Sequence, residues 1–452
     1  MLRVAIIGSG PAGVYAVEAL TRRGDVTVDV FDRLPSPFGL VRYGVAPDHP
    51  KIRSISAALT GVLEHPDVRF LGNVDVGTDI SLTELRTYYD AVLIASGAAV
   101  DRRLGVAGED LPGSFSATDF VAWYNGHPDA PIDAFTVDAR SVAVVGMGNV
   151  AVDVVRLLAK TADDLRSTDM PDHVLGVLDR SHVTDIHMVG RRGPVQAKFT
   201  TRELRELGEI ANADVLVNAA ELDLDPVSEQ LLATQPAARR NLEVLRGWAE
   251  RRPSGRPRRL HVRFWLRPVE VLGDDRVTGL RVESTQLDES GNAIGTGDLS
   301  TIDAQMVLRS VGYRGLPIPD LPFDERTGTV PNDTGRVLGP GGPELGLYVA
   351  GWIKRGPTGV IGTNKHDARE TVASMLEDVP NLSPAPVRDP DAVVRLLAER
   401  GVVAVNWDGW LAIELAEIEL GQQRGSVRAR ITQRDALLRA ALGAARSGDP
   451  VT

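Results

Sequence analysis

Two glycine-rich turns constrain this chain more than any other feature, because each stands between a short apolar run and an amphipathic segment. The first turn is Gly8-Ser9-Gly10-Pro11-Ala12-Gly13, after Val4-Ala5-Ile6-Ile7. The second is Gly146-Met147-Gly148-Asn149-Val150-Ala151, after Val142-Ala143-Val144-Val145. Continuous apolar runs of this length are typical of buried parallel strands. The sequence therefore predicts an α/β protein that contains two strand–turn–helix units.

Each turn has the spacing of a dinucleotide-binding fingerprint. The first glycine, Gly8, permits a sharp turn, and the second, Gly10, lets the backbone approach a pyrophosphate. The third, Gly13, allows close packing of helix on strand, and Ala151 takes that place in the second copy, after Gly148. The helix that follows presents free N–H groups to the phosphates. Two dinucleotides in one chain are expected to exchange a hydride.

The residues that end the following strands differ between the two units. Val26–Phe31 reads as a strand that ends at Asp32, and an acid there favours FAD or NAD by accepting hydrogen bonds from ribose hydroxyls. Ile186–Val189 is followed by Gly190-Arg191-Arg192-Gly193, with no acid. Two guanidinium groups favour a 2′-phosphate and therefore NADP.

Four further stretches are informative, namely Pro35–Lys51, Gly148–Asp153, Gly190–Pro194 and Gly351–Lys365. They resemble the ferredoxin–NADP⁺ reductases of the adrenodoxin reductase type, and the similarity runs to about residue 440. This resemblance implies two Rossmann-like domains, with the NADP-binding domain inserted into a discontinuous FAD-binding domain. It also implies a flavoenzyme that takes a hydride from NADPH onto FAD and delivers single electrons to an iron–sulfur protein.

The resemblance implies individual roles as well. The residues expected at FAD are Ala12, Asp32, Leu40, Val76, Trp352, Gly359, Val360 and Ile361. Those expected at NADPH are Asn149, Val150, Arg191, Arg192 and Glu203, with Gly359 close to both cofactors and Arg102 at a further nucleotide contact. His49 and Glu206 are the candidates for proton handling. The ribose-binding acid is usually Glu in this family, whereas here it is Asp32.

Domain organisation follows from the same motifs. Residues 1–104 and 313–452 are predicted to form the FAD-binding domain, the second part with a C-terminal extension, and residues 105–312 the inserted NADP-binding domain. The strand Ala91–Ala95 precedes the first crossing, and Met306–Gly312 precedes the return. Thr363 is expected to cap a helix that runs to about Glu377.

The chain contains no cysteine, which excludes a redox-active disulfide and a cysteine-ligated cluster within it. The electron acceptor must then be a separate molecule, and the composition fits a cytoplasmic protein. No signal peptide, transmembrane helix or short-spaced Cys/His metal site is expected. Two rivals stay open on the sequence: an FAD/NADPH-dependent monooxygenase, and a non-catalytic nucleotide sensor or reductase-like subunit.

The net charge of −11 disfavours nucleic acid as a partner, but the charge is uneven. Ten arginines and only two acids lie between Arg239 and Arg267. A basic surface on an acidic protein can steer an acidic partner such as a ferredoxin. Arg239, Arg240 and Arg246 are predicted to lie in this docking surface, on a chain expected to be a monomer.

Overall fold

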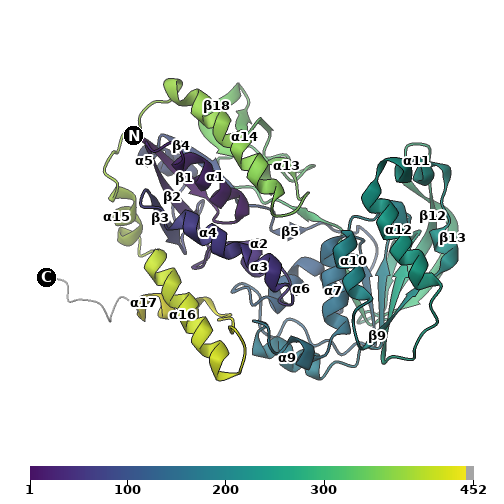
Figure 1. Ribbon diagram of the computed structural model, residues 1–452. Helices are drawn as coiled ribbons and strands as arrows, with labels where there is room; N and C mark the ends of the chain where they lie inside the picture. Colours follow the sequence, from purple (N-terminus) through teal and green to yellow (C-terminus); the bar gives the residue numbers. More distant parts are fainter. Residues whose placement is uncertain (444–452) are drawn as a thin grey trace. The chain divides into compact units, whose positions relative to one another are not determined.

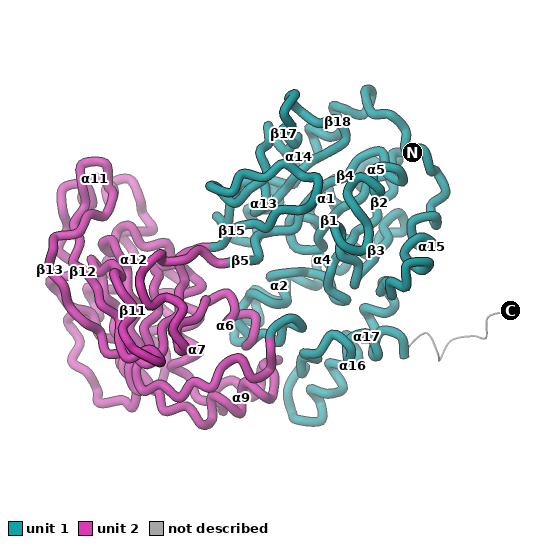
Figure 2. Tube along the Cα trace, turned by 180° about the vertical axis from the view of Figure 1, so that it is seen from behind, with its two compact units in different colours: residues 1–100, 125–130, 313–452 teal, residues 101–124, 131–312 magenta. Residues whose placement is uncertain are grey.

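The computed structural model describes residues 1–443, which pack into two compact units (Figure 2). Unit 1 comprises Met1–Val100, Asn125–Ala130 and the chain from Tyr313 onward. Unit 2 comprises Asp101–Tyr124 and Pro131–Gly312. Two-residue strands, β5 (Val100–Asp101) and β15 (Tyr313–Arg314), mark the points where the chain passes between the units. The predicted third segment runs to residue 452, and its last nine residues, 444–452, lie outside the described residues.

Unit 1 is built on a seven-stranded sheet of order β16-β17-β18-β4-β1-β2-β3 (Figure 1). Its strands are β1 (Leu2–Ile7), β2 (Val26–Asp32), β3 (Val68–Gly72), β4 (Ala91–Ile94), β16 (Asn332–Asp333), β17 (Arg336–Gly339) and β18 (Gly342–Val349). The five strands from β18 to β3 run parallel, and β16 and β17 add an antiparallel edge. The predicted strand before Asp32 is therefore present, one residue longer than expected.

Helices pack against both faces of this sheet, so alternate residues of β1 enter different cores. Leu2, Val4 and Ile6 join one hydrophobic cluster, and Ala5 and Ile7 join the other. The first cluster includes side chains of α1 (Pro11–Thr21), α4 (Ile55–Leu63), α14 (Thr363–Asp378), α16 (Trp407–Gln423) and α17 (Arg434–Gly443). The second includes α5 (Leu82–Tyr88) and α15 (Ala392–Glu399). The short helices of this unit are α2 (Leu40–Tyr43), α3 (Pro50–Arg53) and α13 (Trp352–Arg355).

Unit 2 contains a six-stranded parallel sheet of order β6-β14-β7-β8-β10-β9. Its strands are β6 (Ser114–Ser116), β7 (Ser141–Val145), β8 (Asp185–Val189), β9 (Ala213–Val217), β10 (Arg258–Arg263) and β14 (Met306–Arg309). A second sheet joins β11 (Leu266–Leu272), β12 (Gly279–Leu287) and β13 (Ala293–Asp303) in antiparallel order. Side chains of this second sheet share a core with Ala143, Val145 and Val189 of the first.

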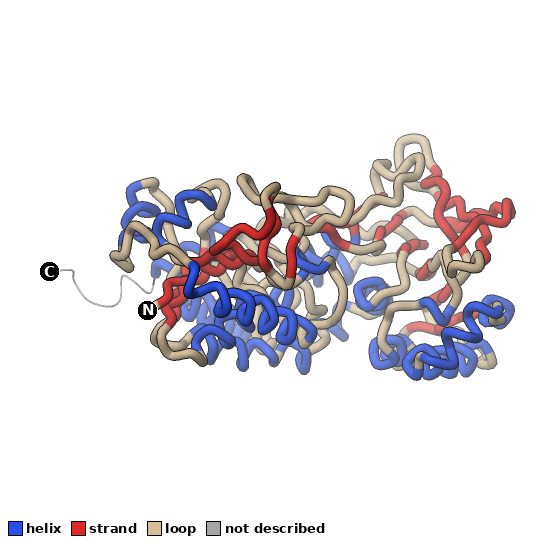
Figure 3. The backbone as a smooth tube through the Cα atoms, turned by 90° about the horizontal axis from the view of Figure 1, so that it is seen from above, coloured by secondary structure: helices blue, strands red, loops and turns tan. Residues whose placement is uncertain are grey.

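Unit 2 also contains helices, which Figure 3 draws in blue. They are α6 (Ala117–Tyr124), α7 (Asn149–Ala159), α8 (Ala162–Leu165), α9 (Asp172–Asp179), α10 (Thr201–Leu207), α11 (Pro226–Thr234) and α12 (Pro236–Ala249). Helices α8 and α9 fill the polar stretch between the second glycine-rich turn and β8. Within residues 1–443, no helix combines the length and apolar character that a membrane crossing requires.

One helix start differs from the sequence prediction. Thr363 was expected to cap α14, but it is the first residue of that helix, and Gly362 holds the N-cap position. The Thr363 hydroxyl instead accepts a hydrogen bond from the N–H of Val360, 3.2 Å away. Thr363 therefore stabilises the loop that precedes the helix.

Candidate functional site

The first glycine-rich turn joins β1 to α1, and its glycines are there for different reasons. Gly8 has φ +106°, and a Cβ there would lie 2.5 Å from the carbonyl oxygen of Ala95. At Gly13 a Cβ would lie 1.9 Å from the carbonyl oxygen of Gly8, so helix and strand approach as closely as predicted. A Cβ on Gly10 would meet nothing within 4 Å. Because no side chain caps α1, its first N–H groups can face a phosphate.

Asp32 ends β2, and its carboxylate is tied to the glycine-rich turn. It accepts hydrogen bonds from the N–H of Ser9 and the N–H of Leu34, both at 2.9 Å, and from the Ser9 hydroxyl. Burial raises the pKa of Asp32, although these hydrogen bonds oppose the shift. A carboxylate has about four acceptor sites, so the short side chain still has an acceptor position for a ribose hydroxyl while it holds the turn.

The segment before α2 closes over the first turn. The N–H of Phe38 donates to the carbonyl oxygen of Ser9 at 3.1 Å. Gly39 has φ +47°, and a Cβ there would lie 3.1 Å from the Cα of Gly10. Leu40, expected at FAD, begins α2 directly after this contact and is 39% exposed. The backbone next to Leu40 therefore lies against Gly10 within unit 1.

The segment after β18 reaches the same turn from a distant part of the sequence. A Cβ on Gly351 would lie 2.6 Å from the Cβ of Ala12. Trp352 follows, and its indole N–H is buried without a hydrogen-bond partner among the described residues. The loop that leads to α14 carries Gly359 and Ile361, and Val360 between them is 59% exposed. An unsatisfied donor and an exposed apolar side chain beside a glycine-rich turn are features that a bound flavin nucleotide would satisfy.

Val76 occupies a different position from the other predicted FAD residues. Its side chain is buried, and the residue forms a parallel bridge with Ile80. Its connection to the site runs through the backbone, because the N–H of Val74 donates to the carbonyl oxygen of Asp32 at 2.9 Å. The residues of unit 1 thus bring Gly10, Asp32, Leu40 and Trp352 around one turn, and they fit FAD.

The second glycine-rich turn joins β7 to α7 in unit 2. A Cβ on Gly146 would lie 2.2 Å from the carbonyl oxygen of Ser310, whereas a Cβ on Gly148 would meet nothing within 4 Å. Gly148 is the N-cap of α7, and no side chain caps the helix. The carbonyl oxygen of Met147 accepts hydrogen bonds from the N–H groups of Lys198 and Phe199 at 2.7 and 3.1 Å. This turn therefore also presents a helix N-terminus beside open space.

Arg191 and Arg192 follow β8 next to this turn. The adjacent Gly190 packs on the turn itself, since a Cβ there would lie 2.5 Å from the Cγ of Met147. The carbonyl oxygen of Arg191 accepts a hydrogen bond from the hydroxyl of Thr285 at 2.8 Å. That of Arg192 accepts one from the N–H of Trp265 at 3.4 Å. Neither guanidinium makes an ion pair or hydrogen bond within residues 1–443. Two fixed backbones with unpaired cationic side chains fit the 2′-phosphate of NADPH.

Asn149 and Glu203 flank the second turn. The side-chain oxygen of Asn149 accepts a hydrogen bond from the N–H of Thr200 at 2.8 Å, which joins α7 to the segment that begins α10. Glu203 lies in the first turn of α10 and is buried, and its Oε2 has no hydrogen-bond partner among the described residues. Val150 is half-buried in the first turn of α7. An orphaned carboxylate oxygen at this position fits a ribose hydroxyl of NADPH.

The two candidates for proton handling lie in different units. His49, in unit 1, is buried and is the N-cap residue of α3. Glu206, in unit 2, lies near two guanidinium groups, with its carboxylate oxygens 3.5 Å from Nη1 of Arg156 and 3.4 Å from Nε of Arg202. Arg102 is exposed, and its N–H donates to the carbonyl oxygen of Gly312 at 2.8 Å.

Several residues that shape the unit 1 site carry no recognisable sequence signal. Asp367 accepts a hydrogen bond from the N–H of Gly351 at 2.5 Å, and Asn364 accepts one from Arg355 at 2.8 Å. These contacts fix both ends of the loop that carries Gly359. Ser9 occupies a variable position of the glycine-rich turn, and its link to Asp32 depends on how two strands lie side by side. A motif search finds the glycines but not the side chains that hold them.

Helix α12 displays the predicted basic surface. Arg239, Arg240 and Arg246 are exposed on it. Other arginines of the same stretch are structural: Arg258 donates to the carbonyl oxygens of Val183, Ala159 and Lys160, and Arg256, Arg259, Arg263 and Arg267 also bind carbonyl or carboxylate oxygens of unit 2. The concentration of arginines in sequence therefore serves two purposes, and only part of it forms an exposed cationic surface.

Comparisons with known proteins agree with this geometry. A family model described as pyridine nucleotide-disulphide oxidoreductase matches residues 2–206. The chain is 42% identical to NADPH-ferredoxin reductase FprA of Mycobacterium tuberculosis, over 97% of this chain and 99% of that protein. It is 38% identical to the mitochondrial NADPH:adrenodoxin oxidoreductase of Arabidopsis thaliana, over 97% of this chain and 95% of that protein.

A solved structure of M. tuberculosis FprA in complex with NADPH superimposes with a TM-score of 0.93. The superposition covers 98% of this chain and 100% of the FprA chain, at 42% sequence identity. Both the sequence and the fold are thus similar over almost the whole length. The chain belongs to the family of NADPH–ferredoxin and adrenodoxin reductases.

Proposed function

We propose that this protein is an FAD-dependent oxidoreductase that takes a hydride from NADPH and passes single electrons to a ferredoxin-type iron–sulfur protein. The observation that carries the proposal is the pair of dinucleotide-binding turns, one in each unit, of which only the second is followed by unpaired arginines. FAD, when bound, accepts the hydride and can release its electrons one at a time. The protein itself supplies binding, orientation and electrostatics.

In unit 1, the N-terminus of α1 would hold the pyrophosphate of FAD, and Gly10 would let the backbone approach it. Asp32 would accept a hydrogen bond from a ribose hydroxyl while it keeps Ser9 in place. Leu40, Val360 and Ile361 would offer apolar contacts, and the indole N–H of Trp352 would gain the acceptor that it lacks among the described residues. The backbone near Val76 would border the FAD site next to Asp32.

In unit 2, the N-terminus of α7 would hold the pyrophosphate of NADPH, with Asn149 and Val150 in the first turn. Arg191 and Arg192 would bind the 2′-phosphate by charge-assisted hydrogen bonds. Glu203 would accept a hydrogen bond from a ribose hydroxyl through Oε2. Arg102 would make a further contact with the nucleotide.

For His49 and Glu206 we propose positioning roles. Hydride transfer to a flavin requires no protein base, because the cofactor carries out the chemistry. The side chain of His49 is buried before α3 and does not cap that helix, which suits a role in packing and orientation. Glu206 forms ion pairs with Arg156 and Arg202, which suits a carboxylate that holds these two arginine side chains in position.

The electron acceptor is proposed to be a separate ferredoxin-type protein, because this chain has no cysteine to ligate a cluster of its own. The exposed arginines of α12, namely Arg239, Arg240 and Arg246, are proposed as part of its docking surface. We further propose a monomer in the cytoplasm, where NADPH and an oxidised ferredoxin would both be available. Gel filtration with light scattering tests the first of these two statements.

An anaerobic titration of the purified, FAD-loaded protein tests the reductase assignment. NADPH and NADH are added in parallel, and the visible flavin absorption is followed. We expect NADPH to bleach the flavin at a concentration at least about tenfold below that required of NADH, because one charged hydrogen bond to the 2′-phosphate is worth about 1.5–3 kcal/mol.

Each alternative outcome overturns a definite part of the assignment. A protein that cannot be loaded with FAD, or a flavin that neither coenzyme reduces, would exclude the reductase and favour the nucleotide sensor. An equal response to the two coenzymes would leave the reductase but exclude the role given to Arg191 and Arg192. Adding an acidic [2Fe–2S] ferredoxin after reduction then tests whether electrons leave the flavin singly.

A further inference from the structure

Three potential metal ligands meet on one face of the unit 2 sheet, and none of them is among the residues proposed to contact NADPH. Asp185 and His187 lie on β8, and His261 lies on its parallel neighbour β10. In this register His187 pairs with His261, and Asp185 pairs with Arg259. Paired and alternate residues of neighbouring strands point to the same face. One ligand atom from each of the three side chains lies within 4.8 Å of the other two.

The contacts within this group leave a buried nitrogen without a partner. Nε2 of His261 lies 2.9 Å from Oδ1 of Asp185. The imidazole rings of His187 and His261 stack with centroids 4.3 Å apart and an angle of 12° between their planes. Nδ1 of His187 is buried and has no hydrogen-bond partner within the described chain. A buried polar atom without a partner is unusual, and a bound ion is one of the ways to satisfy it.

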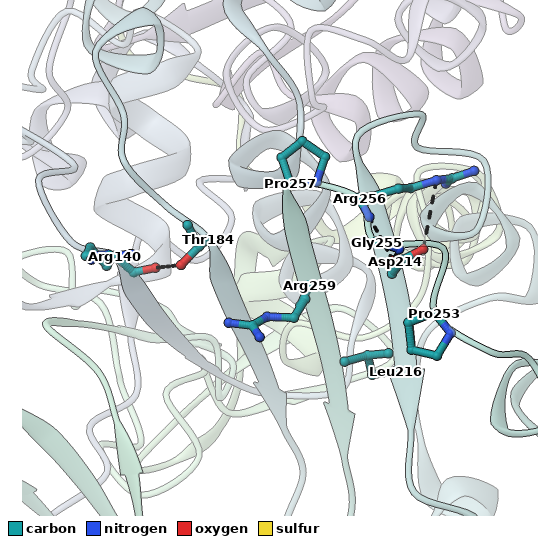
Figure 4. Close-up of a pocket in the computed structure, with 9 residues that line it drawn as sticks. All are labelled: Arg140, Thr184, Asp214, Leu216, Pro253, Gly255, Arg256, Pro257 and Arg259. Carbon is teal, nitrogen blue, oxygen red and sulfur yellow. Dashed lines mark hydrogen bonds and ion pairs between the residues drawn. The ribbon is translucent and has the colours of Figure 1, made fainter.

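Two residues that pair with members of this group in the sheet line a cavity of about 580 Å³. Figure 4 shows Arg259 and Leu216 on neighbouring strands of its wall, with Thr184 at the start of β8. Arg259 is the register partner of Asp185, and Leu216 is the register partner of His261. The side chains of Asp185 and His261 are 17% and 24% exposed, so an ion can reach them from solvent.

The nearby arginines do not make this position strongly cationic. Arg259 forms an ion pair with Asp185 at 2.5 Å. Arg263, two residues after His261 on β10, forms one with Glu221 at 2.8 Å. The hydroxyl of Thr184 donates to Oδ2 of Asp185 at 2.9 Å, and Oδ1 is the oxygen that contacts His261. The two guanidinium charges are therefore each balanced by a carboxylate.

We propose that Asp185, His187 and His261 form a binding site for a divalent transition-metal ion of the Zn²⁺ type. Two imidazoles and a carboxylate are a donor set that Zn²⁺ takes with three protein ligands, and the fourth position is then open to water or an exogenous ligand. Ligand atoms around tetrahedral Zn²⁺ lie roughly 3.4 Å apart for bonds of about 2.0–2.1 Å, so small side-chain rotations complete the site.

Isothermal titration calorimetry of the holoprotein with Zn²⁺ tests the proposal at a pH above 6.5, the ordinary pKa of histidine. We expect one Zn²⁺ per chain in the wild type. His187→Gln and His261→Gln should each weaken binding by more than the roughly 10–100-fold that loss of an outer-shell partner costs. The matched control is His182→Gln, which removes an exposed histidine three residues before Asp185 and should leave binding unchanged.

Two outcomes would overturn the proposal: no saturable Zn²⁺ binding by the wild type, or an equal loss of binding in His182→Gln. Circular dichroism establishes that the variants are folded. If the His187 or His261 variant fails to fold, X-ray absorption at the zinc edge of the wild-type complex decides the matter. The scattering of two imidazole rings would support the site, and a shell of oxygen ligands alone would contradict it.

Discussion

Arg191 and Arg192 are the residues on which the coenzyme preference depends. Their backbones are fixed by Thr285 and Trp265, and their guanidinium groups have no partner within residues 1–443. We expect Arg191→Ala to weaken NADPH by about one to two orders of magnitude, because a charged hydrogen bond contributes about 1.5–3 kcal/mol and about 1.4 kcal/mol corresponds to a tenfold change. The affinity for NADH should hardly change.

The measurement is kcat/KM for each coenzyme with a fixed electron acceptor. Arg166→Ala is the matched control, because Arg166 is an exposed arginine of the same unit that pairs with Asp163. It should alter neither value. If Arg191→Ala reduced NADPH and NADH equally, the arginine would serve general nucleotide binding, and the explanation by the 2′-phosphate would be wrong.

For single residues, the sequence predicts where the backbone requires a glycine better than it predicts which side chains contact one another. The close approach at Gly13 was predicted from spacing alone, and the Cβ that cannot be accommodated there confirms it. The hydrogen bonds between Ser9 and Asp32, and the contact of Asp185 with His261, depend on the register of neighbouring strands. Register is set by packing, and no local pattern around Asp185 signals a residue 76 positions away.

Helix α16 illustrates how an element outside the nucleotide-binding turns supports them. Its Glu417 and the Arg42 of α2 form an ion pair at 2.6 Å, with side chains 0% and 3% exposed. Arg42 also stacks on Trp410 of the same helix, and Phe38 meets that indole edge to face. Because Phe38 donates its N–H to Ser9, α16 is connected to the first glycine-rich turn through two contacts.

We expect Glu417→Gln to lower the free energy of unfolding by about 3–5 kcal/mol, because it leaves Arg42 buried without its counter-charge. Glu414→Gln on the same helix is the control. Its pair with Arg428 is partly exposed, and its loss should cost at most about 1 kcal/mol. Thermal unfolding followed by near-ultraviolet circular dichroism compares the two variants. If both variants were destabilised equally, the buried ion pair would contribute no more to the free energy of unfolding than the partly exposed one.

The pH dependence of this pair has a definite sign. Burial raises the pKa of Glu417, but Arg42 and Arg430 lower it more, so its pKa lies below the ordinary value. The stabilisation by this carboxylate is therefore complete above its ordinary pKa of about 4.3 and is lost as the pH falls through the lowered value. The difference in melting temperature between the wild type and Glu417→Gln should shrink accordingly on acidification.

Elements were predictable where a local pattern specifies them. The first glycine-rich turn located α1, and the apolar run Val26–Phe31 located β2, since periodicity and glycine spacing are local signals. The start of α14 was misplaced by one residue. The hydroxyl of Thr363 accepts a hydrogen bond from the N–H of Val360, in the preceding loop, and does not cap the helix. The three-stranded sheet β11–β13 was not predicted, since β13 is largely exposed and lacks an apolar run.

At the scale of the whole molecule, one short segment was not predicted from the order of the motifs. Asn125–Ala130 lie within unit 1 although the residues on either side belong to unit 2. Ion pairs explain their place, because Asp129 binds Arg33 and also Arg434, the latter at 3.1 Å. These contacts join residues about 100 and 300 positions apart, and no sequence motif predicts them.

The distribution of charge over the molecule leads to a prediction about its partner. The net charge is −11, yet Arg239, Arg240 and Arg246 are exposed on α12. If these residues steer an acidic ferredoxin, the triple variant R239E/R240E/R246E should slow ferredoxin reduction by roughly tenfold or more at low ionic strength. The effect should fade in salt, because the screening length falls from about 10 Å at 0.1 M to about 3 Å at 1 M.

The control must separate position from net charge. R166E/R326E/R395E reverses three other exposed arginines and changes the net charge equally, so it should have little effect if α12 is the docking surface. The readout is kcat/KM for ferredoxin across a salt series, with NADPH-dependent reduction of a small neutral acceptor as the internal reference. A loss confined to ferredoxin and to the α12 variant supports docking there, because a neutral acceptor experiences no steering. Equal losses in both variants would mean that the ferredoxin responds to total charge, and the arginines of α12 would then have no special part in docking.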